Sequence, residues 1–324
     1  MNSTHTRSSI LLAAALVALP VTASAQTAKD YFTKAFGEAK AGEFDAAIAD
    51  YDHAIALDPN YQDAFFGRGA AKRAKGDDDG AIADYSRAIE LFPADGTSYG
   101  GRGAAKVAKG DDDGAISDLS MAIGLNPRDA ISFLYRGSAR FGKRDFTGAL
   151  ADYDQGIALA PDNVAAYGSR GVAKDVLGDF EGARADYAKS IELNPARATY
   201  VRFRLALILR RQGADDTAAG LGAAVAGWSE GWTKTVGAFL AGTITEADFL
   251  AAAAIGDSQT VRGQQCEAYY YAGMLRLLNH DPARARDLFE RCTATGVAAY
   301  QEFALAQAEI DRLAGAGAAP RVQA

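Results

Sequence analysis

The chain repeats one turn at a fixed interval of 34 residues. Each copy ends in a Leu-x-Pro turn, and the five prolines are Pro59, Pro93, Pro127, Pro161 and Pro195. In the same register one column is glycine (Gly69, Gly103, Gly137, Gly171) and another is alanine (Ala47, Ala81, Ala115, Ala149, Ala183). A period of this length indicates a supersecondary unit that cannot bury its apolar face alone and stacks on its neighbours.

Each unit contains two helical patterns. In the second unit, residues 65–72 follow a 3.6-residue period, Gly76 interrupts it, and residues 81–88 follow the period again. The unit is therefore predicted to be an antiparallel helical hairpin. The sequence contains no strand-like alternation, so stacked hairpins should form a solenoid whose concave face is lined by the first helices.

Small residues where two helices meet, and a proline where the second helix stops, resemble the tetratricopeptide repeat (TPR). The resemblance implies an all-α fold, a right-handed superhelical solenoid of helix hairpins closed by a degenerate C-terminal cap. We divide the chain into a signal peptide (1–25), five TPR units (26–196), a degenerate sixth repeat (197–227), a helical cap with a TPR-like hairpin (228–314) and a disordered tail (315–324). Within the cap, Trp228 and Trp232 are expected to close the core or to anchor a partner.

The first 25 residues differ from everything that follows. Arg7 precedes an apolar run at 10–19, Pro20 ends the run, and Ala23-Ser24-Ala25 matches a signal-peptidase site. The run is too short to span a bilayer. We expect export and cleavage, which gives a periplasmic protein in a Gram-negative source; the alternative is a buried N-terminal helix. Without Arg7 the formal charge changes from −7 to −8, and no basic face for nucleic acid is evident.

Two charged columns run through the repeats. One is basic (Lys34, Arg68, Arg102, Arg136, Arg170) and one is acidic (Asp50, Asp84, Asp118, Asp152, Asp186). They could bind a charged partner, but we expect them to pair within or between hairpins and to set the stacking register. The runs at 77–79 and 111–113 lack the EF-hand pattern for calcium, so we interpret them as acidic helix N-termini and expect no metal or cofactor.

Two cysteines, Cys266 and Cys292, lie at similar distances from the turn of the hairpin in the cap. In an antiparallel hairpin they should meet, and an exported protein encounters oxidants. We therefore predict a disulfide, with two buried thiols as the alternative. Catalysis is not expected, because His53 and His280 are the only histidines after the leader and neither is near a nucleophile in the inferred layout.

The predicted partner-binding groove runs along the first helices. Its candidate residues are Phe32, Phe66, Arg73, Val107, Leu134 and Phe141. The positions that hold a terminal carboxylate in chaperone-tail binders are apolar or small here, for example Gly100 and Gly168. The groove is therefore expected to accept an apolar helix or an extended segment of another protein. Any one of the aromatic residues could instead belong to the core between repeats.

Residues 239–254 and 266–313 are similar in layout to the end of the bacterial Nlp-type TPR lipoprotein, although no lipid-accepting cysteine is present. That family implies an adaptor of the cell envelope that brings a peptidoglycan enzyme to its protease. We expect a non-enzymatic envelope scaffold that binds protein partners, and homodimerisation is compatible with such a solenoid. The alternative is a permanent subunit of a secretion or polysaccharide-export assembly.

Overall fold

The computed structural model describes residues 26–196, 198–214, 221, 225, 227, 230–298 and 300–317. Every regular element in these ranges is a helix. Five hairpins come first: α1 (Ala28–Ala41) with α2 (Phe44–Leu57), α3 (Gln62–Ala74) with α4 (Asp78–Leu91), α5 (Gly96–Lys109) with α6 (Asp112–Leu125), α7 (Ala130–Gly142) with α8 (Phe146–Leu159), and α9 (Val164–Leu177) with α10 (Phe180–Leu193). The segment predicted as a sixth repeat contributes α11 (Thr199–Arg211). The cap follows as α13 (Trp232–Leu240), α14 (Glu246–Ala252), α15 (Ser258–Leu278), α16 (Pro282–Ala294) and α17 (Gln301–Gly317).

Some predicted features cannot be compared with the structure. The leader 1–25, Trp228 and residues 318–324 lie outside the described residues. The described part of the chain ends with α17, which continues to Gly317.

An aspartate is the N-cap residue of each second helix from α4 to α10. The side chain of Asp77 accepts a hydrogen bond from the backbone N–H of Gly80 at 2.9 Å, and Asp111 and Asp145 do the same at their helices. This is an N-cap, which typically stabilises a helix by about 1 kcal/mol. The glycine is required for space, because a Cβ atom on Gly80 would lie 2.2 Å from the capping carboxylate. The acidic runs therefore begin helices, as predicted.

A large apolar side chain from each second helix packs against the first helices; it is a tyrosine in most hairpins and Leu119 in the third. Tyr85 lies between Gly69 of its own hairpin and Gly101 of the next one, and a Cβ atom on these glycines would lie 3.2 Å and 2.7 Å from the ring. Tyr153 contacts Gly137 in the same way. Each glycine of the column thus leaves room for the large apolar side chain of the same hairpin, and this contact repeats along the solenoid.

The cap has a larger core than the repeats. Its hairpin, α15 with α16, reuses the repeat contact, since Gly273 faces the ring of Phe289 and a Cβ atom there would lie 2.6 Å from that ring. Trp232 stacks on Phe249 with ring centroids 5.4 Å apart, and its indole N–H donates to Glu267 at 2.9 Å. Trp232 therefore packs in the cap, as its predicted closing role requires.

Helix α17 ties the cap back to the solenoid. Arg204 and Arg211 on α11 bind Glu302 and Glu309 on α17, each at 2.7 Å, so the two helices run in the same direction with a seven-residue spacing on both. Arg312 reaches further and donates to the carbonyl of Val176 at the end of α9 at 3.0 Å. Arg204 continues the basic column in sequence, but its partner comes from the far end of the chain.

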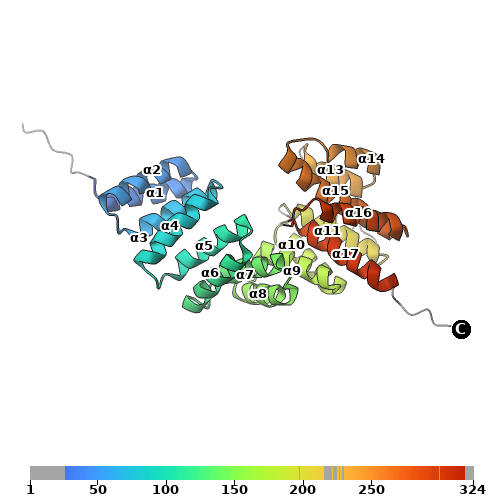
Figure 1. The fold of residues 1–324 in the computed structure, drawn as a ribbon, viewed down its shortest axis with the longest axis horizontal. Helices are drawn as coiled ribbons and strands as arrows, with labels where there is room; N and C mark the ends of the chain where they lie inside the picture. The colour runs from blue at the N-terminus through green and yellow to red at the C-terminus, as the bar shows by residue number, and fades with distance from the viewer. Residues whose placement is uncertain are drawn as a thin grey trace, which may run out of the picture.

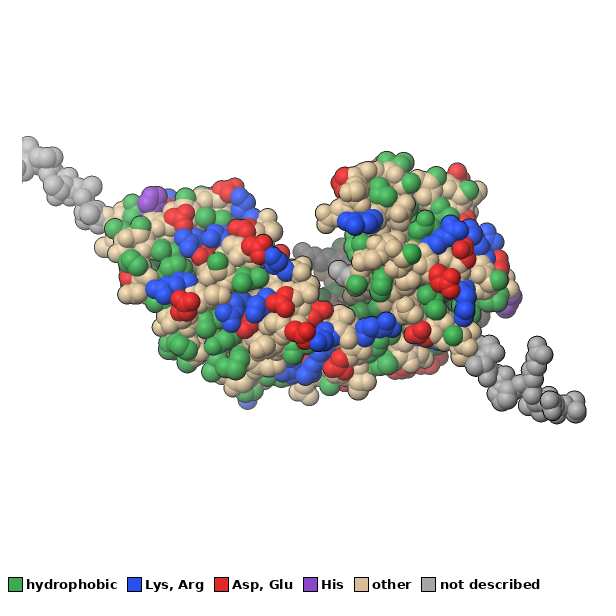
Figure 2. Space-filling model, in the orientation of Figure 1, with side chains coloured by type: hydrophobic (Ala, Val, Ile, Leu, Met, Phe, Trp, Pro, Cys, Tyr) green, Lys and Arg blue, Asp and Glu red, His purple; other side chains and the backbone are tan. Residues whose placement is uncertain are grey.

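The hairpins follow one another in a curved row, with the cap helices α13 to α16 turned back above its C-terminal end (Figure 1). In the same view the molecule is hollowed between the first hairpins and the cap (Figure 2). Lys and Arg side chains alternate with Asp and Glu over this face (Figure 2).

Candidate protein-interaction groove

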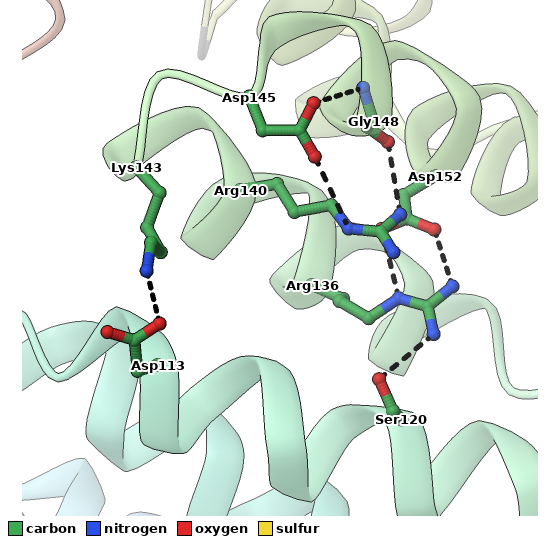
Figure 3. Close-up of polar contacts among 8 residues, drawn as sticks. All are labelled: Asp113, Ser120, Arg136, Arg140, Lys143, Asp145, Gly148 and Asp152. Atoms are coloured by element: carbon green, nitrogen blue, oxygen red, sulfur yellow. Dashed lines mark hydrogen bonds and ion pairs between the residues drawn. The ribbon is translucent and has the colours of Figure 1, made fainter.

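The opposed charge columns pair with each other inside every hairpin. Arg136 donates to Asp152 through two nitrogens, at 3.0 and 2.7 Å, and Arg140 one turn later donates to the same carboxylate at 2.7 Å (Figure 3). The corresponding ion pairs are Lys34–Asp50, Arg68–Asp84, Arg102–Asp118 and Arg170–Asp186. The acidic side chains of the column are at most 9% exposed, so they are not available to a partner. The columns set the stacking, as predicted.

The titration of these groups reflects the pairing. Burial alone would raise the pKa of the Asp118 carboxyl, but hydrogen bonds from Arg102 and Lys106 outweigh burial and hold that pKa below its ordinary value. The basic column also links neighbouring hairpins, because Arg136 donates to Ser120 of the preceding hairpin at 3.2 Å (Figure 3). A separate ion pair outside the two columns, Lys143 with Asp113, joins the same two hairpins (Figure 3).

The first hairpins leave a hollow of about 400 Å³ between α1 and α3, which we call the N-terminal hollow. Phe32, Phe36 and Phe66 line it, together with Tyr51 from α2. Phe36 is 49% exposed and offers its ring to solvent, while Lys40 lies over that ring at 4.4 Å. The hollow is therefore an apolar surface with a charged rim.

A second hollow of about 240 Å³ lies between α7 and α9 and is named the middle hollow. Leu134 lines it beside Ile131, which is 52% exposed. Tyr153 forms part of the floor, where burial raises the pKa of its hydroxyl to about 12, so the ring stays neutral. Three of the six candidate groove residues, Phe32, Phe66 and Leu134, thus line a hollow on the first-helix face.

The surface between these hollows is narrower. Gly100 on α5 allows α7 to come near, because a Cβ atom there would lie 3.1 Å from Ser132. Across this narrow part, Arg73 donates from α3 to the hydroxyl of Tyr135 on α7 at 3.4 Å. Arg73 therefore bridges the groove between the two hollows.

Two candidate groove residues belong to the core between repeats. Val107 packs against the cluster formed by Ala115, Leu119 and Ala139, and Phe141 packs edge-on against Phe146 with centroids 5.1 Å apart. Neither lines the two hollows. Conversely, Ile131 and Tyr135 were missed. They lie three residues before and one residue after Leu134, so helical periodicity around Leu134 could have identified Ile131.

The two cysteines meet, but they form no disulfide. The Sγ atoms of Cys266 and Cys292 are 3.0 Å apart, whereas a disulfide requires about 2.05 Å. Both thiols are fully buried, and that of Cys292 donates weakly to the carbonyl of Glu302 at 3.7 Å. The two cysteines are therefore close together, as predicted, and the structure shows them as two free, buried cysteines rather than as a disulfide.

The described residues contain no group of three or more His, Cys, Asp and Glu side chains that could hold a metal ion. His53 stacks on Tyr31 with ring centroids 4.9 Å apart, and His280 occupies the turn before α16 with a φ of 62°. Among the helices of the described part, none is both long and apolar enough to cross a membrane.

Comparison with known proteins agrees with the fold. Tetratricopeptide repeat family models match residues 38–72, 63–95 and, as three overlapping matches, 101–164, 134–198 and 169–231. The curated proteins gave no match.

Solved structures resemble the chain at low identity. A tetratricopeptide repeat protein from Parabacteroides merdae is 14% identical, over 87% of this chain and 98% of that one, with a TM-score of 0.54. The APC/C hetero-tetramer Cut9–Hcn1 contains a chain that is 18% identical, over 71% of this chain and 43% of that one, with a TM-score of 0.55. The MamA protein is 24% identical, over 53% of this chain and 94% of that one, with a TM-score of 0.46.

At these identities the structural likeness supports the fold alone. The family matches together span more than half of the chain and coincide with the hairpins from α2 to α11. The chain belongs to the tetratricopeptide repeat proteins.

Proposed function

We propose that this protein is a scaffold that binds a segment of another protein along the first-helix face of its solenoid. The observation that supports this most directly is the pair of apolar hollows, one lined by Phe36 and Phe66 and the other by Ile131 and Leu134. Solvent-exposed aromatic and aliphatic side chains in a concave surface are what an apolar helix or extended segment needs as anchors. TPR folds generally bind protein or peptide partners.

The proposed location is the cell envelope of a Gram-negative bacterium. The support comes from sequence: the leader at 1–25 and the layout shared with Nlp-type adaptors at 239–254 and 266–313. We accordingly propose export to the periplasm and a role in regulating a peptidoglycan enzyme. N-terminal sequencing of the protein recovered from a periplasmic extract tests this, since the mature chain should begin at Gln26.

Export also bears on the cysteine pair. In the periplasm, we propose that a thiol-oxidising enzyme removes two electrons and two protons from Cys266 and Cys292, which then form one S–S bond. Their separation of 3.0 Å requires only a small approach. The protein from the periplasm should then weigh about two hydrogen masses less than the same mature sequence made in a reducing cytoplasm.

The groove can be tested with variants that keep the core intact. Phe36→Asp with Ile131→Asp places a charge in each hollow, and both side chains are about half exposed, so the fold should persist. A matched control is Leu57→Asp with Phe92→Asp, because these side chains are equally exposed but line neither hollow. Each tagged full chain would be cross-linked in the envelope and its partners identified.

Partners that are lost from the groove variant and kept by the control would support the scaffold. Equal recovery from the parent and both variants would show that the first-helix face is not the binding surface. The alternative function, a permanent subunit of an export assembly, predicts stable co-fractionation with membranes and no exchange with added free protein. No specific contact of the described residues favours that alternative.

A further inference from the structure

A third cavity lies where the solenoid meets the cap, and we call it the junction cavity. Its volume is about 600 Å³, and it is lined by α9, α10, α11 and the first residue of α17. It is more polar than the two hollows, with Asn163, Ser190, Arg204 and Gln301 among its lining residues. Because Gln301 comes from the C-terminal helix, the docked cap completes one wall of the cavity.

The junction cavity continues the groove. Asn163, Ala165 and Ser169 line both the junction cavity and the middle hollow, so the two spaces are neighbours along α9. A chain segment that places an aliphatic side chain beside Ile131 therefore presents its adjacent residues to the junction cavity. The groove changes from apolar to polar within a few residues of the bound segment.

The charge in this cavity is already balanced. Arg204 is only 5% exposed, and its guanidinium donates to Glu302 at 2.7 Å and to Gln301 at 2.5 Å. A carboxylate entering the cavity would meet an arginine that is neutralised and would lie near the negative Glu302. It would lose its hydration without gaining a free cation, which is unfavourable.

Hydrogen-bond donors remain in the cavity. The buried Nε atom of Arg204 has no acceptor within the described part of the chain. Asn163 uses its side-chain oxygen to accept from the N–H of Ala166 at 3.1 Å, which leaves its NH₂ group as a donor. Gln301 likewise uses its oxygen as the acceptor for Arg204, so its NH₂ group is the part that can donate. Amide NH₂ donors beside an arginine whose charge is already balanced suit a neutral carbonyl oxygen.

We propose that the junction cavity binds a carboxamide side chain, Asn or Gln, that follows an aliphatic residue in a partner's peptide segment. The inference rests on the proposed function, since it specifies the sequence read by the same groove. The aliphatic residue occupies the middle hollow, and the carboxamide oxygen accepts hydrogen bonds from the NH₂ groups of Asn163 and Gln301. Its own NH₂ group faces the hydroxyl of Ser169.

The floor of the cavity offers a way to block it. A Cβ atom on Gly168 would lie 3.5 Å from Val201 and 3.8 Å from Ser190, which is ordinary contact, so a larger side chain at 168 would begin without a clash and extend into the cavity. Gly168→Leu is therefore the blocking variant. Its matched control is Gly124→Leu, because a Cβ atom on Gly124 meets nothing within 4 Å. Gln301→Glu is a second variant that keeps the acceptor for Arg204 but replaces the NH₂ donor with an oxygen.

The test is selection of phage-displayed random dodecapeptides on the immobilised full chain, followed by affinity measurement with synthetic copies that are blocked at both ends. We expect the selected peptides to share an aliphatic residue followed within two positions by Asn or Gln. Their affinity should fall about tenfold on Gly168→Leu and on Gln301→Glu and remain unchanged on Gly124→Leu. Changing the peptide's Asn or Gln to Asp or Glu should weaken binding by a similar factor.

Two results would overturn the inference. One is unchanged binding by Gly168→Leu and Gln301→Glu, and the other is equal or tighter binding of the acidic peptides. If such peptides still lose binding on Phe36→Asp with Ile131→Asp, the scaffold function stands and only the carboxamide site fails. If no peptide is selected by the folded parent, both proposals fail. Circular dichroism of each variant separates a blocked cavity from an unfolded protein.

Discussion

Removal of the Asp152 carboxylate should destabilise the middle of the solenoid far more than removal of a surface carboxylate. The Asp152 side chain is 3% exposed and accepts three charge-assisted hydrogen bonds from Arg136 and Arg140. In Asp152→Ala, two guanidinium groups lose their shared counter-ion (Figure 3). Arg136 keeps only its bond to Ser120 at 3.2 Å.

The magnitude follows from burial. Breaking a buried ion pair by removing one partner costs about 3–5 kcal/mol. Here the two arginine side chains are 16% and 27% exposed and can partly rehydrate, so the lower end, about 3 kcal/mol, is expected. The matched control is Asp154→Ala, two residues later on α8. Its side chain is 57% exposed and pairs with Arg170 at 2.7 Å, so the loss should stay below about 1 kcal/mol.

The assay is urea unfolding followed by circular dichroism, with a second signal from hydrogen exchange in α7 and α8. In a solenoid each hairpin is held by its neighbours, so weakening the fourth hairpin should also broaden or split the unfolding transition. Asp154→Ala should leave the shape of the transition unchanged. A cost below about 1 kcal/mol for Asp152→Ala, or an equal cost for the two variants, would refute the reasoning from burial.

Three further predictions concern packing, pH and the cap. Gly137→Ala puts a methyl group 2.7 Å from the ring of Tyr153 and should destabilise the fold by about 1–3 kcal/mol. Gly124→Ala, with open space around it, should stabilise the fold by about 0.5–1 kcal/mol. The urea midpoints of the two variants should therefore shift in opposite directions from the parent, and shifts in the same direction would contradict the contact. Burial, and then the charge of a neighbouring glutamate, raises the pKa of Glu267 to about 7. Below pH about 4 this carboxyl is protonated in both the folded and the unfolded protein. Between pH about 4 and pH about 7 only the folded protein keeps the proton, so the free energy of unfolding falls as pH rises, by roughly 3 kcal/mol in total. Glu267→Gln should remove that decline in a pH series of urea midpoints, and an unchanged slope would exclude this group as the cause. Glu309→Ala removes a carboxylate that is 4% exposed from two arginines and should speed hydrogen exchange throughout α17, while Asp311→Ala, 64% exposed on the same helix, should not.

The candidate site was only partly predictable. Phe32, Phe66 and Leu134 line the hollows because the first-helix face is set by the repeat register. Val107 lies in the core between repeats, although it occupies the same column as Arg73, one unit later. The difference arises because Val107 packs, partly buried, against the cluster of α6 and α7, whereas Arg73 reaches across α5 to Tyr135 on α7. Such a difference depends on the actual packing of three helices, so periodicity alone does not reveal it.

By itself the sequence determined the repeat architecture. The sequence columns of proline, glycine and large apolar residues, the capping aspartates and the pairing of Arg136 with Asp152 all join residues within one hairpin or adjacent ones. The 34-residue period repeats each of these contacts four or five times. The meeting of Cys266 and Cys292 followed from hairpin symmetry for the same reason.

Only the tertiary structure decided how the cap closes on the solenoid. Arg204 binds Glu302 across 98 residues, and Arg312 binds the carbonyl of Val176 across 136 residues. Each of these contacts occurs once, without a period, and a single charged residue has many equally suitable partners in the sequence. Their geometry depends on where the chain returns after α11, and that return also creates the junction cavity.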